Sequence, residues 1–270
     1  MLRKIWSLAE LVIIDGLRRH ALMGLIFLAL GLEAGGLLFF DFIPRDIGRA
    51  SGDFILTIGW LTGFLFLLFH AVQVIAWDEE RRTIHTLLAR PISRTQYVLG
   101  VFLGLSVLLM FLNSILAILG CGILVFIKNS VGPVHFLHLS LFHYFLSWIG
   151  LFCIELLILS VILLFSGLVR GGFPVLIITV AYYFICIGMP VVRSVFLNST
   201  DELHKKINIT LKWLTLAFPD FSRFDFKRLI TNDSIDVFFK YFYIDIANTI
   251  LYIVITLWLA SFIYQRRDLQ

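Results

Sequence analysis

Six apolar stretches, each long enough to cross a lipid bilayer, constrain this chain more than any other feature. They cover residues 21–40, 54–76, 97–127, 144–169, 172–197 and 246–264. A helical span needs about 20 apolar residues, because a helix rises ~1.5 Å per residue through ~30 Å of hydrocarbon. No alternating pattern typical of membrane strands is present. The sequence therefore predicts an all-α polytopic membrane protein with six transmembrane helices.

Composition supports the same fold class. Hydrophobic residues make up 60% of the chain and charged residues 15%, so the apolar surface needs lipid rather than a water-bounded core. The three cysteines, Cys121, Cys153 and Cys186, lie far apart in apolar stretches. They predict neither a disulfide framework nor a zinc site.

Residues 1–20 precede the first apolar stretch and differ from it. Charges spread through this segment argue against a cleavable signal peptide. Apolar residues recur at helical spacing, at Leu2, Ile5, Trp6, Ala9, Val12, Ile13 and Leu17. We expect an amphipathic elbow helix that lies along the membrane interface. Leu8, Leu11 and Ile14 interrupt its polar side, which leaves open that part of it packs against the bundle.

Basic residues predict the orientation of the six-span domain, residues 21–270. They gather before span one, between spans two and three, after span four and after span six, at Arg3, Lys4, Arg18, Arg19, Arg81, Arg82, Arg90, Arg94, Arg170, Arg266 and Arg267. Short basic loops stay on the cytoplasmic side. Both termini are therefore expected in the cytoplasm and the chain in the inner membrane. The pI near 9.0 then reflects topology, and a nucleic-acid partner is not expected.

The long segment 198–245 is expected on the outer side, with short helices. Its aromatic residues either lie at headgroup depth or cap the bundle, and the sequence leaves both open. Gly188 and Pro190 predict a break near the outer end of span five.

The charged segment 77–96, between spans two and three, is the most specific motif. A helix is expected to begin near Asp78 and to end before Pro91, and Ser93 is placed to cap a second helix. Thr83, Leu87 and Leu88 form a short apolar stripe on the first of these helices. We interpret the segment as a cytoplasmic docking site for a soluble partner. The coupling residues are Asp78, Glu79, Glu80, Arg81, Thr83, Leu87, Leu88, Arg90, Pro91 and Arg94.

Two motifs carry a family resemblance. Residues 80–100 read ERRTIHTLLARPISRTQYVLG and resemble the signature "E…GT…LLs.PisR…..GK" of ABC type 2 exporter permeases. Residues 262–269, FIYQRRDL, are similar to the "F.rRDl" ending of many members. The chain departs from the pattern at Arg82, where Gly is common, and at Val101, where Lys is common.

The resemblance implies a permease subunit that forms a dimer. Each copy would engage a separate cytoplasmic ABC ATPase, two copies in all, which would bind ATP and Mg. No catalytic site or cofactor is expected in the chain itself, which has no G-x-x-x-x-G-K-[ST] phosphate loop. The substrate would pass through a cavity between the two permease copies, while spans two and three shift relative to the rest.

Polar residues inside the apolar stretches are candidates for a substrate path or gate. They are Glu33, His70, Asn113 and Glu155. The alternative is structural, with these groups neutral or hydrogen-bonded at helix contacts. His135, His138 and His143 lack carboxylate or thiol neighbours, so no metal site is predicted. Small residues at positions 31 and 34–36 suit either a dimer contact or packing within the chain.

Few fixed charges within the spans favour a hydrophobic or amphiphilic cargo such as a lipid, glycolipid or drug-like molecule. Two other classes of function stay open. An ion-coupled secondary transporter would depend on Glu33, His70 or Glu155. A membrane scaffold without transport would keep the docking segment alone.

Overall fold

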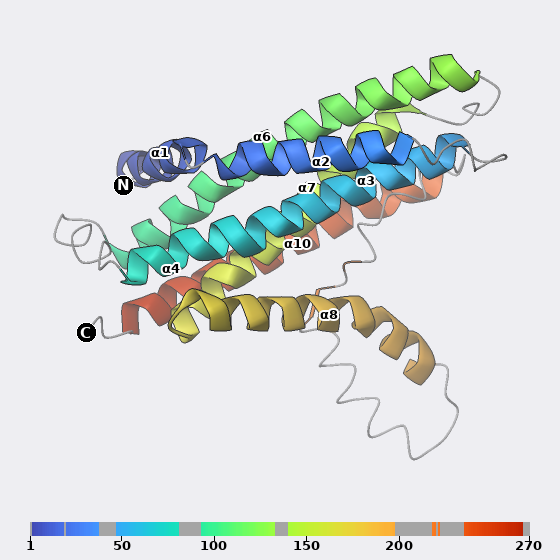
Figure 1. Ribbon diagram of the computed structural model, residues 1–270. Helices are drawn as coiled ribbons and strands as arrows, with labels where there is room; N and C mark the ends of the chain where they lie inside the picture. The colour runs from blue at the N-terminus through green and yellow to red at the C-terminus, as the bar shows by residue number, and fades with distance from the viewer. Residues whose placement is uncertain are drawn as a thin grey trace.

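A computed structural model describes residues 2–18, 20–37, 47–80, 93–132, 140–197, 218–219, 221 and 235–266. The elements in these ranges are all helical, apart from short turns (Figure 1). They are α1 (Leu2–Arg18), α2 (Ala21–Leu37), α3 (Ile47–Leu65), the π-helical η2 (Phe66–Ala71), α4 (Val72–Glu80), α6 (Arg94–Val131), α7 (Leu141–Leu168), α8 (Gly172–Leu197) and α10 (Ile235–Arg266).

Five helical stretches in the described ranges are long and apolar enough to cross a membrane. They cover residues 47–76, 94–130, 141–168, 172–192 and 243–266. The first joins α3, η2 and α4 into one continuous helix. The prediction of a helical multi-span protein is confirmed for these five. The described part of α2 is apolar but only 17 residues long, about 26 Å, so the sixth span stays a prediction.

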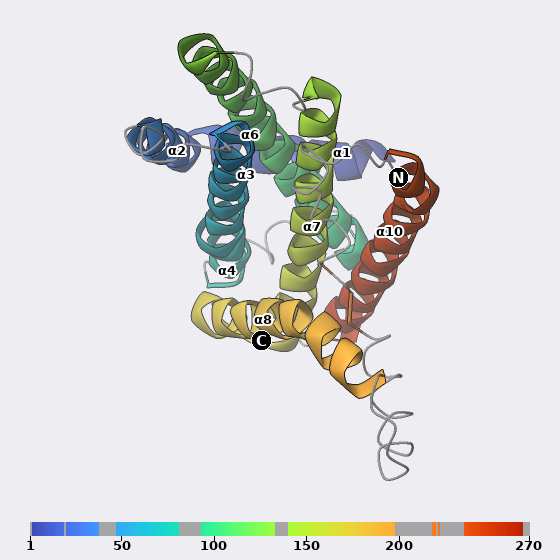
Figure 2. The ribbon, with the colours of Figure 1, turned by 90° about the vertical axis from the view of Figure 1, so that its right-hand side faces the viewer.

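Two predicted helix boundaries are wrong and one is confirmed. Asp78 does not begin a helix, because residues 78–80 form the end of α4, which starts at Val72. Pro190 does not break α8, which continues to Leu197; Figure 2 shows that α8 bends along its length, as proline in a helix allows. Ser93 is the predicted N-cap: its Oγ accepts a hydrogen bond from the Gln96 amide, and Gln96 completes a capping box.

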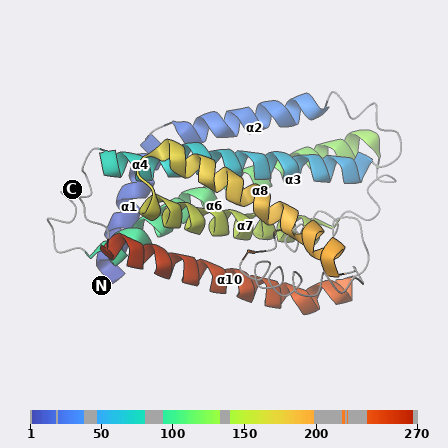
Figure 3. The same ribbon diagram turned by 90° about the horizontal axis from the view of Figure 1, so that it is seen from below.

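The centre of the bundle is α6, which packs against α1, α3, α7 and α10. Its inward side carries fully buried leucines, at Leu105, Leu108, Leu109, Leu112 and Leu116. Lipid tails are as apolar as these side chains, so close van der Waals contact holds the helices together. Figures 1 and 3 show the end of α4, the start of α6 and the end of α10 at the same end of the bundle.

Helix α1 crosses α6 at two glycines of α6, which have no side chain and let the two helices approach closely. A Cβ at Gly100 would lie 2.7 Å from Leu8 Cβ, and one at Gly104 would lie 2.7 Å from Val12 Cβ. The other buried residues of α1 are Ile5, Ala9 and Gly16. The open alternative that this segment packs against the bundle is thus confirmed for these residues. Trp6 and Leu11 are exposed on α1, and its interfacial placement stays a prediction.

The small residues of α2 divide between two environments. A Cβ at Gly36 would overlap the ring of Phe54 on α3, so this glycine serves packing within the chain. Gly31 and Gly35 have open space beside them. A dimer contact through these two glycines stays a prediction.

The long segment 198–245 is described only in part. The Phe221 ring lies 5.9 Å from that of Tyr183, and the Phe218 ring lies 5.6 Å from that of Tyr182, both on α8. For these two aromatics the cap on the bundle is the better description. The last third of the segment begins α10 at Ile235.

Candidate functional site

A buried polar pair joins α6 to α7 in the middle of the bundle. The Glu155 side chain is 0% exposed and that of Asn113 is 6% exposed. Asn113 Nδ2 donates to Glu155 Oε2 at 2.5 Å and to the Leu109 carbonyl at 3.1 Å. Two of the four polar residues predicted for a substrate path therefore meet.

Two glycines of α3 allow this pair to lie against the α3 backbone. A Cβ at Gly63 would overlap the Glu155 carboxylate, and one at Gly59 would overlap the Trp148 indole. The glycines are four residues apart, so they lie on the same face of α3. The sequence analysis missed them, although the G-x-x-x-G spacing at 59–63 is typical of close helix contacts in membranes.

The pair has hydrogen-bonding capacity left over. Asn113 Oδ1 and Glu155 Oε1 are buried and find no partner among the described residues. An unmet buried polar atom costs about 1–3 kcal/mol, and polar groups at membrane depth usually mark a functional position. The arrangement therefore suits a site that takes a hydrogen bond from something not in the chain, such as water or a substrate.

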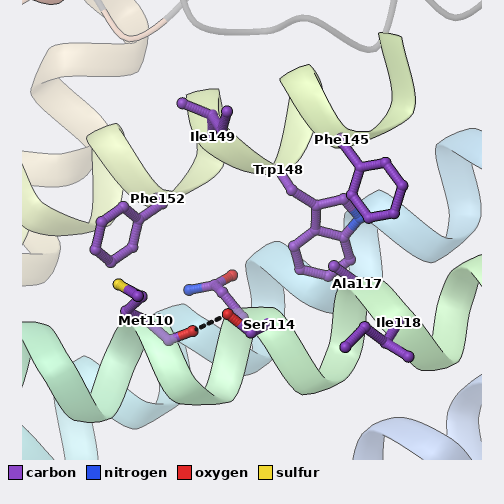
Figure 4. Close-up of a pocket in the computed structure, with 9 residues that line it drawn as sticks. Met110, Ser114, Ala117, Ile118, Phe145, Trp148, Ile149 and Phe152 are labelled. Atoms are coloured by element: carbon purple, nitrogen blue, oxygen red, sulfur yellow. Dashed lines mark hydrogen bonds between the residues drawn. The ribbon is translucent and has the colours of Figure 1, made fainter. Parts of the chain in front are cut away.

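An apolar groove of about 370 Å³ runs beside the pair, between α6 and α7 (Figure 4). Asn113 contributes to its wall, and the other lining residues are Met110, Ser114, Ala117, Ile118, Phe145, Trp148, Ile149 and Phe152. Met110, Ile118, Phe145 and Ile149 are also exposed on the outside of the bundle. The groove thus lies on a lipid-facing surface and is suited to an alkyl or aromatic group.

The other two predicted residues lie elsewhere. Glu33 is buried on α2, and neither carboxylate oxygen has a partner among the described residues. His70 lies in η2, where its ring is 5.0 Å from that of Phe66 and its Nε2 would be 3.2 Å from a Cβ at Gly16 of α1. The hydrogen bond that joins two of the four predicted residues is the one between Asn113 and Glu155.

Most of the predicted coupling residues are not described in side-chain detail. Asp78, Glu79 and Glu80 are placed by their backbone at the end of α4. Arg81, Thr83, Leu87, Leu88, Arg90 and Pro91 lie outside the described residues. Arg94 is described and contacts the end of α10. Of the three histidines weighed for a metal, only His143 is described, buried near the start of α7.

Comparison with known families decides the class of protein. The family described as ABC-2 family transporter protein matches residues 53–269, which is most of the chain. The chain belongs to the ABC-2 transporter family. No curated protein matches it. This ABC-2 protein is therefore a multi-pass membrane transport subunit, of a family whose permeases are typically non-catalytic and work with an ABC ATPase.

The Asn113–Glu155 pair should show strong coupling between its members. Asn113→Leu leaves the Glu155 carboxyl without its donor, and we expect it to lower the free energy of unfolding by about 1–3 kcal/mol. Adding Glu155→Met should recover part of that loss, because both partners are then apolar. Unfolding of the purified protein by titration with a denaturing detergent measures this. Ser114→Leu, at a neighbouring exposed position, is the control, and strictly additive losses would contradict the pairing.

Proposed function

We propose that the chain is the permease subunit of an ATP-driven exporter, coupled to its ATPase through segment 77–96. The observation that carries the proposal is the family match together with the way this segment is attached. It leaves the bundle from the end of α4 and re-enters at the capped start of α6. Because both helices continue across the bundle, movement of the segment would reach the interior.

Charge supports a cytoplasmic position for this end of the bundle. Arg94 and Arg266 lie there with the α6–α10 contact, and Arg170 lies between α7 and α8 at the same end (Figure 1). Basic residues are retained on the cytoplasmic side of membranes. Both termini would then be cytoplasmic, with α1 as the elbow, α2 as the sixth span and the inner membrane as the location.

The substrate is proposed to be hydrophobic or amphiphilic. The α6–α7 groove is lined almost wholly by apolar side chains, and Asn113 is its amide. Such a groove suits a lipid-like or drug-like molecule with few polar groups. The complete pathway is proposed to form between two permease copies, with Gly31 and Gly35 on α2 as one candidate contact because space beside them is open.

Isolation of the intact complex tests the proposal. The tagged chain is extracted from its native membrane in mild detergent, and bound proteins are identified by mass spectrometry. We expect an ABC ATPase in a one-to-one ratio and ATP hydrolysis by the complex. Recovery of the permease without any ATPase, under conditions that keep it folded, would contradict ATP-driven export.

Ion-coupled transport is the second candidate, because Glu33 buries a carboxylate with no partner among the described residues. The substitution Glu33→Gln distinguishes ATP-driven export from ion-coupled transport. It should leave ATP hydrolysis by the complex within about twofold if Glu33 only packs against its neighbours. A chain that binds no ATPase but takes up protons in liposomes only when Glu33 is present would support ion coupling.

A further inference from the structure

We infer that Arg94 is a positioning residue for transport, which fastens the start of α6 to the end of α10 so that the two helices move together. The inference rests on the proposed function, since it concerns how a pull on segment 77–96 passes into the bundle. Arg94 was expected to contact the ATPase. Within the chain, its guanidinium binds the end of α10.

The guanidinium of Arg94 binds two backbone carbonyls near the end of α10. Its Nη1 donates to the carbonyls of Tyr264 at 2.8 Å and Gln265 at 3.0 Å. Both carbonyls lie in the last described turn of α10, whose last described residue is Arg266. A cation at this position also stabilises the negative end of the helix dipole.

A third hydrogen bond runs in the opposite direction between the same two helix ends. Gln265 Nε2 donates to Thr95 Oγ1 at 2.9 Å. The backbone that carries Arg94 and Thr95 is itself held by the capping box of Ser93 and Gln96. Each helix therefore donates side-chain hydrogen bonds to the other, and the capping box fixes the backbone at the start of α6.

The contact that Arg94 and Thr95 make with Tyr264 and Gln265 is called the joint below. Tyr264 extends it to α7. Its ring lies 6.2 Å from that of Tyr97, and both residues are buried. Its hydroxyl is 2.8 Å from Ser166 Oγ near the end of α7. A Cβ at Gly167 would come within 3.1 Å of the Tyr264 ring. The joint is thus buried on the inside and hydrogen-bonded at its edge.

The two ends of the coupling segment share α7 as a neighbour, and each packs against a further helix as well. Upstream, α4 packs on the start of α8, where a Cβ at Gly172 would lie 3.0 Å from Ala76 Cβ. Downstream, α6 is fastened to α10 and, through Tyr264, to α7. A displacement of the downstream end should therefore carry α6 and α10 as one body. The sequence analysis expects spans two and three to shift relative to the rest, and the inference adds α10 to the part that moves.

Substitution of Arg94 separates a positioning role from a docking role. In the complex reconstituted in lipid nanodiscs, Arg94→Gln should keep the ATPase bound while ATP hydrolysis falls roughly five- to tenfold, as expected from loss of a charge-assisted hydrogen bond. Arg94→Lys should retain about half the rate or more, because its ammonium still donates to carbonyls. Loss of the ATPase from Arg94→Gln, or an unchanged rate, would overturn the inference.

A cross-link can replace Arg94 if its role is to hold the joint. Thr95→Cys and Gln265→Cys are introduced into a chain in which Cys121, Cys153 and Cys186 are alanine, and a short bifunctional thiol reagent joins them. With Arg94 present, hydrolysis should stay within about twofold of the unlinked protein, and in Arg94→Gln the cross-link should restore it. If the cross-link stops hydrolysis, the joint has to open during the cycle and the inference is wrong.

The same cysteine pair tests the joint in the permease alone. Spin labels on positions 95 and 265 should report one narrow distance distribution with Arg94 and a broader one with Arg94→Gln. Identical distributions would overturn the inference. This measurement needs no ATPase, so a failure of the proposed function, seen as absence of a bound ATPase, is distinguishable from a failure of the joint.

Discussion

The double substitution Leu87→Asp with Leu88→Asp should abolish binding of the ATPase while leaving the permease folded. Both leucines belong to the apolar stripe predicted in segment 77–96, between the end of α4 and the start of α6. Burying a leucine at a contact contributes about 1.5–3 kcal/mol, and each aspartate adds the cost of removing a charge from water. Two substitutions should therefore weaken binding by more than about a hundredfold. Co-purification and a binding titration measure the loss.

The matched control places the same charges on the opposite side of the predicted helix. His85→Asp with Ala89→Asp, four residues apart, lies on the face away from the stripe formed by Thr83, Leu87 and Leu88. This control should bind the ATPase within about tenfold of the unaltered chain. If both double variants lose the ATPase equally, the whole segment is sensitive to charge and the apolar stripe is not the docking surface. If neither loses it, docking lies elsewhere.

Replacing Gly63 by valine should separate α3 from α7 and prevent a stable bundle. A Cβ at this position would overlap the Glu155 carboxylate, and valine adds two further methyl groups with a stiff χ1. Overpacking costs about 1–3 kcal/mol, and displacing Glu155 from Asn113 leaves a buried carboxyl without its donor, which costs about 1–3 kcal/mol more. We expect a loss of several kcal/mol, visible as aggregation in gel filtration or a much lower unfolding midpoint.

Gly122→Val is the control for this prediction. Gly122 lies on α6 in a helix of similar apolarity, and a Cβ there would have nothing within 4 Å. It should change the midpoint only slightly, because a side chain there meets nothing and valine is the better helix former of the two by less than about 1 kcal/mol. Equal losses at positions 63 and 122 would mean that valine acts on the helices themselves and not on the α3–α7 contact.

Much of the fold could be predicted because crossing a membrane depends on local composition. A run such as 144–169 is mostly apolar, and the cost of placing each residue in lipid does not depend on its distant neighbours. Capping is local too, so the role of Ser93 followed from its position before an apolar helix. The start near Asp78 was predicted wrongly because acidic residues favour a helix N-terminus, whereas here α4 arrives from the bundle and ends among them.

The candidate site could be predicted only in part. Asn113 and Glu155 stood out because a polar group in an apolar stretch is costly, but nothing in their spacing, 42 residues apart, indicates that they meet. Glu33 and His70 satisfied the same criterion and lie on other elements, α2 and η2. Gly63 carried a recognisable spacing with Gly59 that pointed to a close helix contact without naming the partner.

The sequence by itself determined that this is a helical membrane protein with a charged segment between two spans, and its motifs pointed to the ABC-2 family that residues 53–269 match. Only the tertiary structure decided which faces meet: Gly63 against Glu155, α1 across Gly100 and Gly104, and Arg94 on the end of a helix 170 residues away. The reason is that insertion into lipid is a sum over neighbouring residues, whereas helix packing within lipid depends on shape and on hydrogen bonds between distant parts of the chain.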